Sequence, residues 1–366
     1  MRKYTNSELC LIWLDSFLGL EYKHKQAIYS LINGKTDIKD LLTKGKDYIT
    51  NEIGVNEYNT LLNSANAEYF GFVLEQLSRK GIIAVTIESE DYPESLLNIS
   101  QPPIVLYCKG NIKLLSANNF SIVGSRKSLP ISINLAKSYA KALLDNGFTL
   151  VTGIAEGVDS AVLETAVNNK KPVISVIAGG FDNIYPSSNV PLLEKVVELG
   201  LAITESPPEV KPMPFHFPVR NRIIAGLSKG TLIVSGAMKS GTLYTAEYAE
   251  EYGRDLFAIP YSAGVYSGEG CNDLIKRGAM LTDKPEDLLE YYGVEKKQNI
   301  KIELTPEQKQ IVALLKEGEM HVEKICSALN KRVYEITSVL AMMEINKIVV
   351  KNGTNFYGLA RLDLEE

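Results

Sequence analysis

The amino-acid sequence predicts an α/β protein whose main domain is a mostly parallel sheet. From residue 81 onward, apolar runs of strand length alternate with helical segments. Near-continuous apolar strands separated by helices indicate a parallel sheet with helices on both faces. The first 80 residues carry only short helical patterns, and three helical patterns followed by two strands lie near the C-terminus. The chain has 366 residues, which exceeds the usual size of one domain, and these observations predict three domains.

Residues 1–80 are predicted to form a small helical domain, of sterile-alpha-motif or helix-hairpin-helix type. Its helical patterns cover residues 9–18, 24–32, 38–43 and 56–78. Helical hairpins of this kind grip nucleic-acid backbones in some proteins and are packing or partner surfaces in others. The sequence leaves both roles open.

Residues 81–292 are predicted to form the sheet domain. The expected strands cover residues 82–87, 104–108, 120–123, 149–152, 173–177, 202–204, 231–234 and 256–259. The expected helices cover residues 131–146, 157–167, 190–199, 216–227 and 243–252. In such sheets, ligands bind at the carboxyl ends of the strands.

Four of the expected strands end in glycine-bearing turns. These turns lie at residues 123–126, 152–157, 178–180 and 235–242. Glycine allows the backbone to approach a ligand closely, because no Cβ stands in the way. A single turn of this kind is typical of ordinary chain reversal, but four on one rim of a sheet predict a ligand groove.

A polar linker is predicted at residues 293–304 and a winged-helix domain at residues 305–362. Helical patterns at 308–316, 322–329 and 333–345 precede apolar segments at 348–350 and 356–358. The turn-forming pair Asn352-Gly353 separates these two segments, and three helices followed by a hairpin is winged-helix order. The third helix begins with two cationic residues but soon carries glutamates. DNA reading and a protein-contact or dimer role therefore both stay open.

The overall composition gives no sign of nucleic-acid binding. Hydrophobic residues make up 45% of the chain and charged residues 23%, and the net charge is −5 with an isoelectric point of about 5.5. A DNA-binding function therefore needs a local basic patch. No apolar run reaches the ~18 residues of a membrane span, and no export signal is evident. We expect a cytoplasmic protein without membrane contact.

The sequence predicts neither a metal site nor a bound cofactor. Its four cysteines and three histidines are dispersed without the spacing of zinc ligands. Each cysteine is expected to be a small core residue in a reducing compartment. Neither G-x-G-x-x-G nor G-x-x-x-x-G-K-[ST] occurs at a strand-to-helix junction, and G-x-S-x-G and H-E-x-x-H are absent. Dinucleotide redox chemistry and ATP hydrolysis thus lose their main support.

The most informative stretch of the chain covers residues 214–245. Arg220, Asn221 and Arg222 lie in a predicted helix, a buried strand follows, and a Gly/Ser/Lys turn then opens another helix. Guanidinium groups bind phosphate in bidentate geometry, and helix N-termini offer unpaired N–H donors. A phosphodiester or nucleotide is therefore the expected ligand. The alternative is that both arginines pair with acidic neighbours and only support the fold.

Motifs along the chain resemble those of the DNA-processing protein A family, also called DprA or Smf. In family order they are DYPESLL at 91–97, PPIVLYCKG at 102–110, VGSR at 123–126, YP at 185–186 before Asn189, ESPP at 205–208, FPVRNRIIAGLS at 217–228, SGTL at 240–243, GR at 253–254 and GA at 278–279. The resemblance covers about residues 85 to 285, and the FPVRNRIIAGLS run is highly specific. The helical start and the winged-helix end are similar to optional modules of that family.

The resemblance implies an extended Rossmann-like fold that binds single-stranded DNA, with no established catalysis. It also implies a role in natural transformation, in which the protein protects incoming strands and helps load the RecA recombinase, usually as a homodimer. Carried over by position, the DNA-binding residues are Gly124, Ser125, Arg126, Phe217, Arg220, Asn221, Arg222, Lys239, Ser240, Gly241 and Thr242. Their cations would follow the phosphates, and Phe217 would either stack on a base or serve as a buried staple of its helix.

The chain departs from the family pattern at three positions. Glu156 replaces a cation, Leu163 replaces a histidine, and Ser235 replaces an acid. One side of the groove is therefore expected to be less basic than in the family. Two alternatives stay open: a nucleotide-binding sensor, and a nucleotide N-glycosidase of a related Rossmann-like family. In the second, Thr245 takes the place of the catalytic glutamate, which speaks against hydrolysis.

Overall fold

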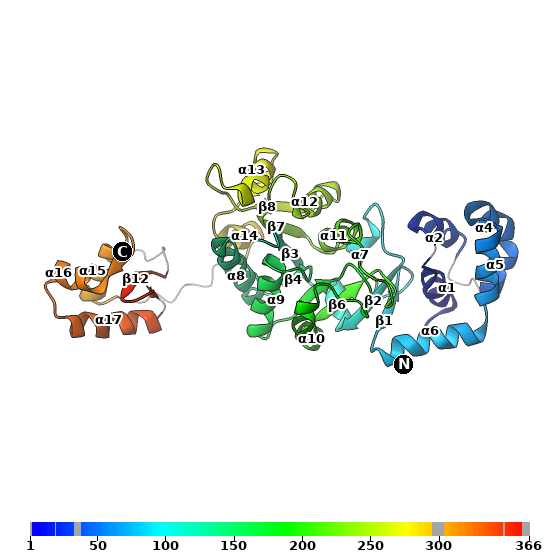
Figure 1. Cartoon of the computed structure of the whole chain (residues 1–366), viewed down its shortest axis with the longest axis horizontal. Helices are drawn as coiled ribbons and strands as arrows, with labels where there is room; N and C mark the ends of the chain where they lie inside the picture. Colours follow the sequence, from blue (N-terminus) through cyan, green and yellow to red (C-terminus); the bar gives the residue numbers. More distant parts are fainter. Residues whose placement is uncertain (1, 19, 33–37, 295–303, 347, 361–366) are drawn as a thin grey trace. The chain divides into compact units, whose positions relative to one another are not determined.

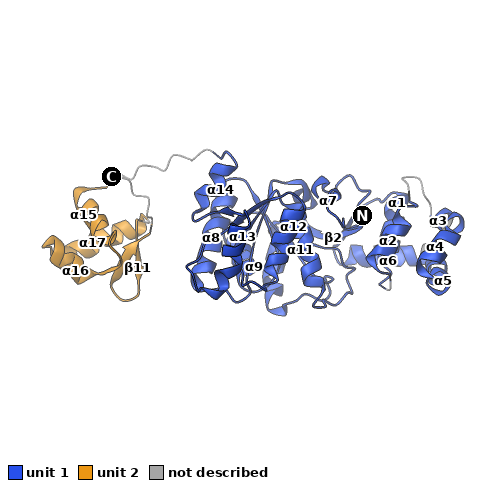
Figure 2. Cartoon of the chain, turned by 90° about the horizontal axis from the view of Figure 1, so that it is seen from above, with its two compact units in different colours: residues 1–295 blue, residues 296–366 orange. Residues whose placement is uncertain are grey.

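The computed structural model describes residues 2–18, 20–32, 38–294, 304–346 and 348–360. The chain forms two compact units, residues 1–295 and residues 296–366 (Figure 2). Most of the predicted linker at 293–304 and the last two residues of the predicted winged-helix domain, 361–362, lie outside the described residues. The boundary predicted at residue 80 falls inside the first unit, so this division stays a prediction.

The first unit is built around a nine-stranded sheet in the order β1-β2-β6-β5-β4-β3-β7-β8-β9. Its strands are β1 (Ile83–Thr86), β2 (Val105–Gly110), β3 (Asn119–Gly124), β4 (Thr149–Thr152), β5 (Val173–Val176), β6 (Leu201–Thr204), β7 (Gly230–Ser235), β8 (Asp255–Ala258) and β9 (Met280–Leu281). The pairings β1 with β2 and β2 with β6 are antiparallel, and the other six are parallel. The predicted mostly parallel sheet is thus confirmed.

The two faces of the sheet are covered because successive residues of each strand point to opposite sides. On β3, for example, Ile122 belongs to one apolar core and Val123 to the other. The first core is covered by α8 (Pro130–Asp145), α9 (Val158–Asn168), α10 (Val190–Leu199) and α14 (Pro285–Tyr291). The second is covered by α7 (Glu94–Leu97), α11 (His216–Leu227), α12 (Thr242–Glu251) and α13 (Glu269–Lys276) (Figure 1). Helices α7, α13 and α14 and strand β9 are short and were not expected from the sequence pattern.

Six helices precede the sheet in the described part of the N-terminal segment. They are α1 (Asn6–Asp15), α2 (Tyr22–Tyr29), α3 (Ile38–Lys44), α4 (Lys46–Ile53), α5 (Val55–Ser64) and α6 (Ala67–Arg79). The single helix predicted at 56–78 is wrong, because Asn66 accepts a hydrogen bond from the Tyr69 N–H at 2.9 Å and starts a new helix. Apolar side chains of these helices share one core with the sheet.

The outer edge of β1 is closed by side chains rather than by another strand. The Ala84 N–H donates to the Tyr4 hydroxyl at 3.2 Å, and the Thr86 N–H donates to Ser89 Oγ at 2.9 Å. Each of these amides points away from β2, since residues of an antiparallel edge strand alternate in pairing direction.

The second unit contains helices α15 (Pro306–Leu315), α16 (Val322–Leu329) and α17 (Val333–Ile345), and strands β10 (Met320–His321), β11 (Val349–Asn352) and β12 (Phe356–Leu359). The strands form an antiparallel sheet in the order β10-β12-β11. The three expected helices and the expected hairpin are present, and their assignment as a winged-helix domain stays a prediction. In the described part of both units, no helix is long and apolar enough to cross a membrane. All four cysteines are buried, as expected of core residues.

Candidate functional site

A large cavity of the sheet unit opens between β3 and β7, where the chain leaves neighbouring strands toward opposite faces of the sheet. Strand β3 has β4 on one side and β7 on the other, and all three run parallel. Helices leaving the carboxyl ends of β3 and β7 cover opposite faces, which opens a crevice between them. The cavity at this point has a volume of about 1030 Å³. Turns that follow β3, β4 and β7 line it, together with helix α11.

The turn after β3 is held by a serine from β7. The Ser125 N–H donates to Ser235 Oγ at 3.2 Å, and the hydroxyls of Ser128 and Ser235 lie 2.8 Å apart. A Cβ on Gly124 would lie 2.5 Å from the Val158 side chain, so only glycine fits at the end of this strand. The packing of β3 against α9 therefore fixes where the turn leaves the sheet.

Arg126 and Phe217 meet at the mouth of the cavity. The Arg126 guanidinium is exposed and lies 4.9 Å from the centroid of the half-buried Phe217 ring. Tyr185, which is 54% exposed, packs edge-on against the same ring at 5.9 Å. A cation and two aromatic rings thus share one wall, an arrangement suited to a phosphate with a neighbouring base.

Arg220 and Asp159 form the floor of the cavity. Both side chains are buried, at 6% exposure each. Burial lowers the pKa of Arg220 to about 10, with nearby Asp159 opposing this effect, and burial raises the pKa of Asp159 against the opposing effect of Arg220. Arg220 donates to the Val176 carbonyl and, through Nε, to Asn221 Oδ1 at 3.2 Å. A pKa near 10 leaves Arg220 charged at neutral pH.

The turn after β7 forms another wall of the cavity. Ser240 Oγ accepts a hydrogen bond from the Thr242 N–H at 3.3 Å and so caps the start of α12. Asn221 of α11 donates through Nδ2 to the Gly241 carbonyl at 3.2 Å, which joins this turn to α11. Lys239 is exposed beside them and lines the cavity.

The structure places Arg222 away from the cavity, contrary to the sequence expectation. Its side chain is 2% exposed and forms a bidentate ion pair with Glu205, at 2.7 and 2.5 Å. The physical reason is helical periodicity: residues two apart on a helix do not share a face, so Arg220 and Arg222 cannot both point into one site. Arg222 thus forms the structural ion pair that was considered as the alternative for both arginines, whereas Arg220 lines the cavity.

Ten of the eleven predicted residues line the one cavity. They are Gly124, Ser125, Arg126, Phe217, Arg220, Asn221, Lys239, Ser240, Gly241 and Thr242. Sequence reasoning missed Lys127, Asp159, Tyr185 and Tyr266 as further lining residues. Lys127 could have been predicted, because it follows Arg126 in the same turn. Tyr185 and Tyr266 lie in loops that are distant in sequence, and only the fold brings them to the cavity.

The four glycine-bearing turns do not all serve the cavity. The turn after β5 packs against the segment that follows β6, since a Cβ on Gly180 would lie 2.1 Å from the Pro207 carbonyl. A Cβ on Gly153, at the end of β4, would lie 2.3 Å from the Asp159 carboxylate and 2.7 Å from the Arg220 guanidinium. Gly153 therefore leaves room for the floor of the cavity, whereas Gly180 serves packing.

The three departures from the family pattern have distinct surroundings. Glu156 is exposed and lines a small neighbouring cavity of about 70 Å³, which Arg126 and Arg220 also line. Leu163 is fully buried in the core. Ser235 holds the turn after β3, as described above. Among the described residues, no group of three or more His, Cys, Asp or Glu side chains could hold a metal ion.

Comparison with known proteins identifies one family. The family model described as DNA recombination-mediator protein A matches residues 83–293. The DNA processing protein DprA of Bacillus subtilis (strain 168) is 40% identical over 220 residues, which cover 60% of this chain and 74% of that protein. Protein Smf of Escherichia coli (strain K12) is 36% identical over 207 residues, covering 56% of this chain and 55% of that protein.

Two solved structures of similar sequence share the fold. The X-ray structure of DprA from Streptococcus pneumoniae matches with a TM-score of 0.63 at 30% identity, covering 79% of this chain and 98% of that chain. A structure of DprA from Helicobacter pylori, reported for its single-stranded DNA binding mode, matches with a TM-score of 0.53 at 29% identity. It covers 57% of this chain and 95% of that chain.

Proposed function

The chain belongs to the DNA recombination-mediator protein A family, and we propose that it binds single-stranded DNA in the cavity between β3, β4 and β7. The relatives named DprA, and the structure from Helicobacter pylori reported for its single-stranded DNA binding mode, support this proposal. The resemblance expected from the sequence is confirmed by these comparisons.

One observation carries the proposal: cationic side chains from separate elements converge on one cavity of an otherwise acidic chain. Four cationic side chains line the cavity, Arg126, Lys127, Arg220 and Lys239, against the single carboxylate of Asp159. The chain as a whole has a net charge of −5. A local concentration of positive charge on such a chain suits a polyanion that is gripped at one place.

The chemistry of the walls indicates how the strand would be held. Guanidinium and ammonium groups would contact phosphates, and the rings of Phe217 and Tyr185 would offer faces for bases. Contacts to phosphates and to the faces of bases carry no sequence information, so binding is expected to tolerate any sequence and to weaken with salt.

The wider role rests on the family. We infer that the protein protects incoming strands in natural transformation and helps load the RecA recombinase. We also infer that it works as a homodimer in the cytoplasm. The family description as a recombination mediator supports the first inference, and the homodimer and RecA contact remain part of the proposal.

We propose no catalytic activity. In a nucleotide N-glycosidase the corresponding position carries a glutamate, but here Thr245 lines the cavity and is 1% exposed. The carboxylate that lines the cavity is that of Asp159. It is buried beside Arg220 and accepts a hydrogen bond from the Ala155 N–H at 3.2 Å. Release of free base from nucleoside monophosphates would contradict this part of the proposal.

Competition between ligands tests the main proposal. A fluorescent oligo-dT bound to the full chain should be displaced by long unlabelled single strands, and millimolar nucleoside monophosphates should leave it bound. Lys239→Ala should weaken binding at moderate salt, while Lys195→Ala, which removes an exposed lysine of α10 outside the cavity, should not. Displacement by mononucleotides at concentrations equal to those of oligonucleotide phosphate would favour the sensor alternative instead.

A further inference from the structure

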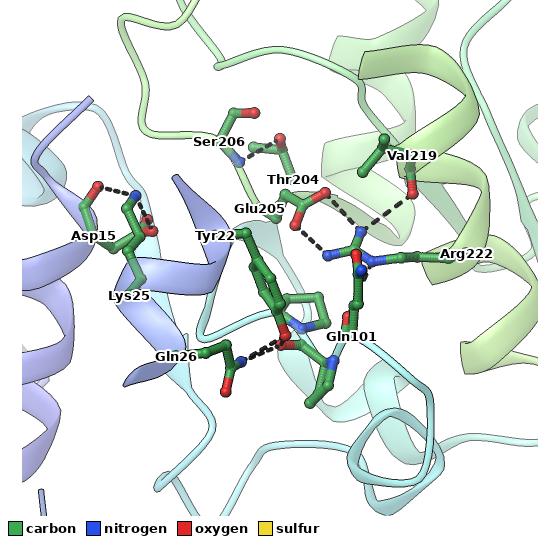
Figure 3. A network of polar contacts seen from close by, with 12 residues as sticks. Asp15, Tyr22, Lys25, Gln26, Gln101, Thr204, Glu205, Ser206, Val219 and Arg222 are labelled. Carbon is green, nitrogen blue, oxygen red and sulfur yellow. Dashed lines mark hydrogen bonds and ion pairs between the residues drawn. The ribbon is translucent and has the colours of Figure 1, made fainter. Parts of the chain in front are cut away.

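A buried ion pair lies behind the helix that carries the proposed DNA-binding residues. Arg222 of α11 donates from both terminal nitrogens to the Glu205 carboxylate, which follows directly after β6 (Figure 3). The side chain of Glu205 is 25% exposed and that of Arg222 only 2%. Burial lowers the pKa of Arg222, but Glu205 more than offsets this effect and the pKa is raised overall. Arg222 is therefore charged, and its bidentate contact holds the pair in a fixed geometry.

Arg222 also joins α11 to a third segment of the chain. Its Nε donates to the Gln101 carbonyl at 2.9 Å, and Nη1 donates to the Val219 carbonyl of its own helix at 3.2 Å (Figure 3). The next residue, Pro102, accepts through its carbonyl from the Tyr22 hydroxyl of α2 at 2.9 Å. One guanidinium thus connects α11, the end of β6 and the loop that α2 contacts through Tyr22.

The end of β6 is itself fixed against the turn after β5. Thr204 Oγ1 donates to the Gly179 carbonyl at 2.8 Å and accepts from the Ser206 N–H at 3.0 Å. Glu205 lies between Thr204 and Ser206, which these two hydrogen bonds hold, so its carboxylate approaches α11 from a fixed backbone. The opposite face of α11 presents Phe217, Arg220 and Asn221 to the cavity.

Since a helix that is fixed on one face cannot rotate, the ion pair determines where the other face points. We propose that Arg222 and Glu205 are positioning residues for single-stranded DNA binding: their pair holds α11 in the rotation that aims Arg220, Asn221 and Phe217 into the cavity. This inference rests on the proposed function and assigns both residues a role without DNA contact.

The direction in which one substitution changes DNA affinity distinguishes a positioning role from a purely electrostatic role. Glu205→Gln removes a negative charge behind the cavity, so a purely electrostatic role predicts tighter binding of a polyanion. A positioning role predicts weaker binding, because an amide cannot make the bidentate charged pair. We expect a loss of roughly tenfold in affinity for oligo-dT, comparable to one lost charge-assisted contact.

Asp15→Asn is the matched control for Glu205→Gln. Asp15 also forms a largely buried ion pair, with Lys25 at 2.8 Å, and accepts from the Tyr107 hydroxyl at 2.8 Å. Both variants replace a carboxylate with an amide beside a paired cation in the same unit, but the partners of Asp15 lie on α2 and β2, whereas the partner of Glu205 lies on α11. Both are expected to lower the unfolding temperature, and only Glu205→Gln should weaken DNA binding and speed amide hydrogen exchange in α11.

Two further variants keep the result interpretable. If Glu205→Gln does not fold, Thr204→Val loosens the same support without changing charge and should also weaken binding. Arg126→Ala, measured with the same oligonucleotide, tests the cavity itself. Parent-like binding by Arg126→Ala would overturn the proposed function. Weakened binding by Arg126→Ala together with unchanged or tighter binding by Glu205→Gln, or by Thr204→Val where it is used, would overturn only the positioning role.

Discussion

Replacing Arg126 by alanine should weaken single-stranded DNA binding more clearly than any other single change at the cavity mouth. Arg126 is exposed and forms no ion pair with the described residues, so its guanidinium is available to a phosphate. Its position over the Phe217 ring, 4.9 Å from the centroid, already restricts its side chain in the unbound protein. Little conformational entropy should therefore be lost when it binds.

The magnitude follows from the contact that is lost. A hydrogen bond to a charged group contributes about 1.5–3 kcal/mol, and the exposure of Arg126 to solvent places the expected loss of binding free energy near the lower end. About 1.5 kcal/mol corresponds to a roughly tenfold rise in Kd. Because single strands release about 0.7 counterions per neutralised phosphate, the slope of log K against log salt should become shallower by about 0.7.

Fluorescence anisotropy of labelled oligo-dT across a series of salt concentrations measures both quantities. Arg126→Lys keeps the charge but loses the planar fork, so its salt slope should match that of the parent while its affinity falls slightly. Lys195→Ala should match the parent in both. If Arg126→Ala retains the parental Kd and the parental slope, Arg126 does not contact phosphate and the cavity assignment is wrong.

Three further changes probe the surroundings of the cavity. Glu156→Lys places a cation where an exposed carboxylate now lies beside Arg126, so affinity for oligo-dT should rise at low salt and the salt slope should steepen by about 0.7; an unchanged slope would show that this wall does not face the strand. Gly153→Ala adds a methyl group 2.3 Å from the Asp159 carboxylate and 2.7 Å from Arg220, so it should weaken binding and cost about 1–3 kcal/mol of stability by overpacking, measured by denaturant unfolding; parental values for both would contradict the contact. Asp159→Asn tests the raised pKa of Asp159: the folded state of the parent retains this proton at a pH where the unfolded state has lost it, so parental stability falls as pH rises above the usual range of an aspartate. The unfolding free energy of the variant minus that of the parent should therefore increase with pH, and a constant or falling difference would contradict it.

Most of the sheet could be predicted from the sequence because its strands are buried on both faces. Every strand from β3 to β7 is an apolar run, and the expected bounds differ from the observed ones by at most one residue at either end. The shortest elements were missed for a different reason, which is their length. Strand β9 has two residues and helix α7 has four, too few to show a period. Their structure depends on neighbours that are distant in sequence.

The site could be predicted in outline, and the placement of Arg222 in it was an avoidable error. The glycine and arginine turns were expected at the carboxyl ends of parallel strands, and the topology brings them together. Arg222 was placed among them although a helix over 216–227 was already expected, and 100° per residue puts Arg222 opposite Arg220. The partner of Arg222 could not be foreseen, because nothing in the local pattern around Glu205 indicates which helix it will meet.

The closed edges of the large sheet limit how two copies of this protein can associate. Strand addition needs a row of unpaired amides, but the outward amides of Ala84 and Thr86 already donate to Tyr4 and Ser89, and the far edge strand β9 offers only two residues. A sheet running continuously through two subunits is therefore disfavoured. A homodimer built on the first unit should therefore use helical or loop surfaces, and its stability should respond to substitutions there and not along β1.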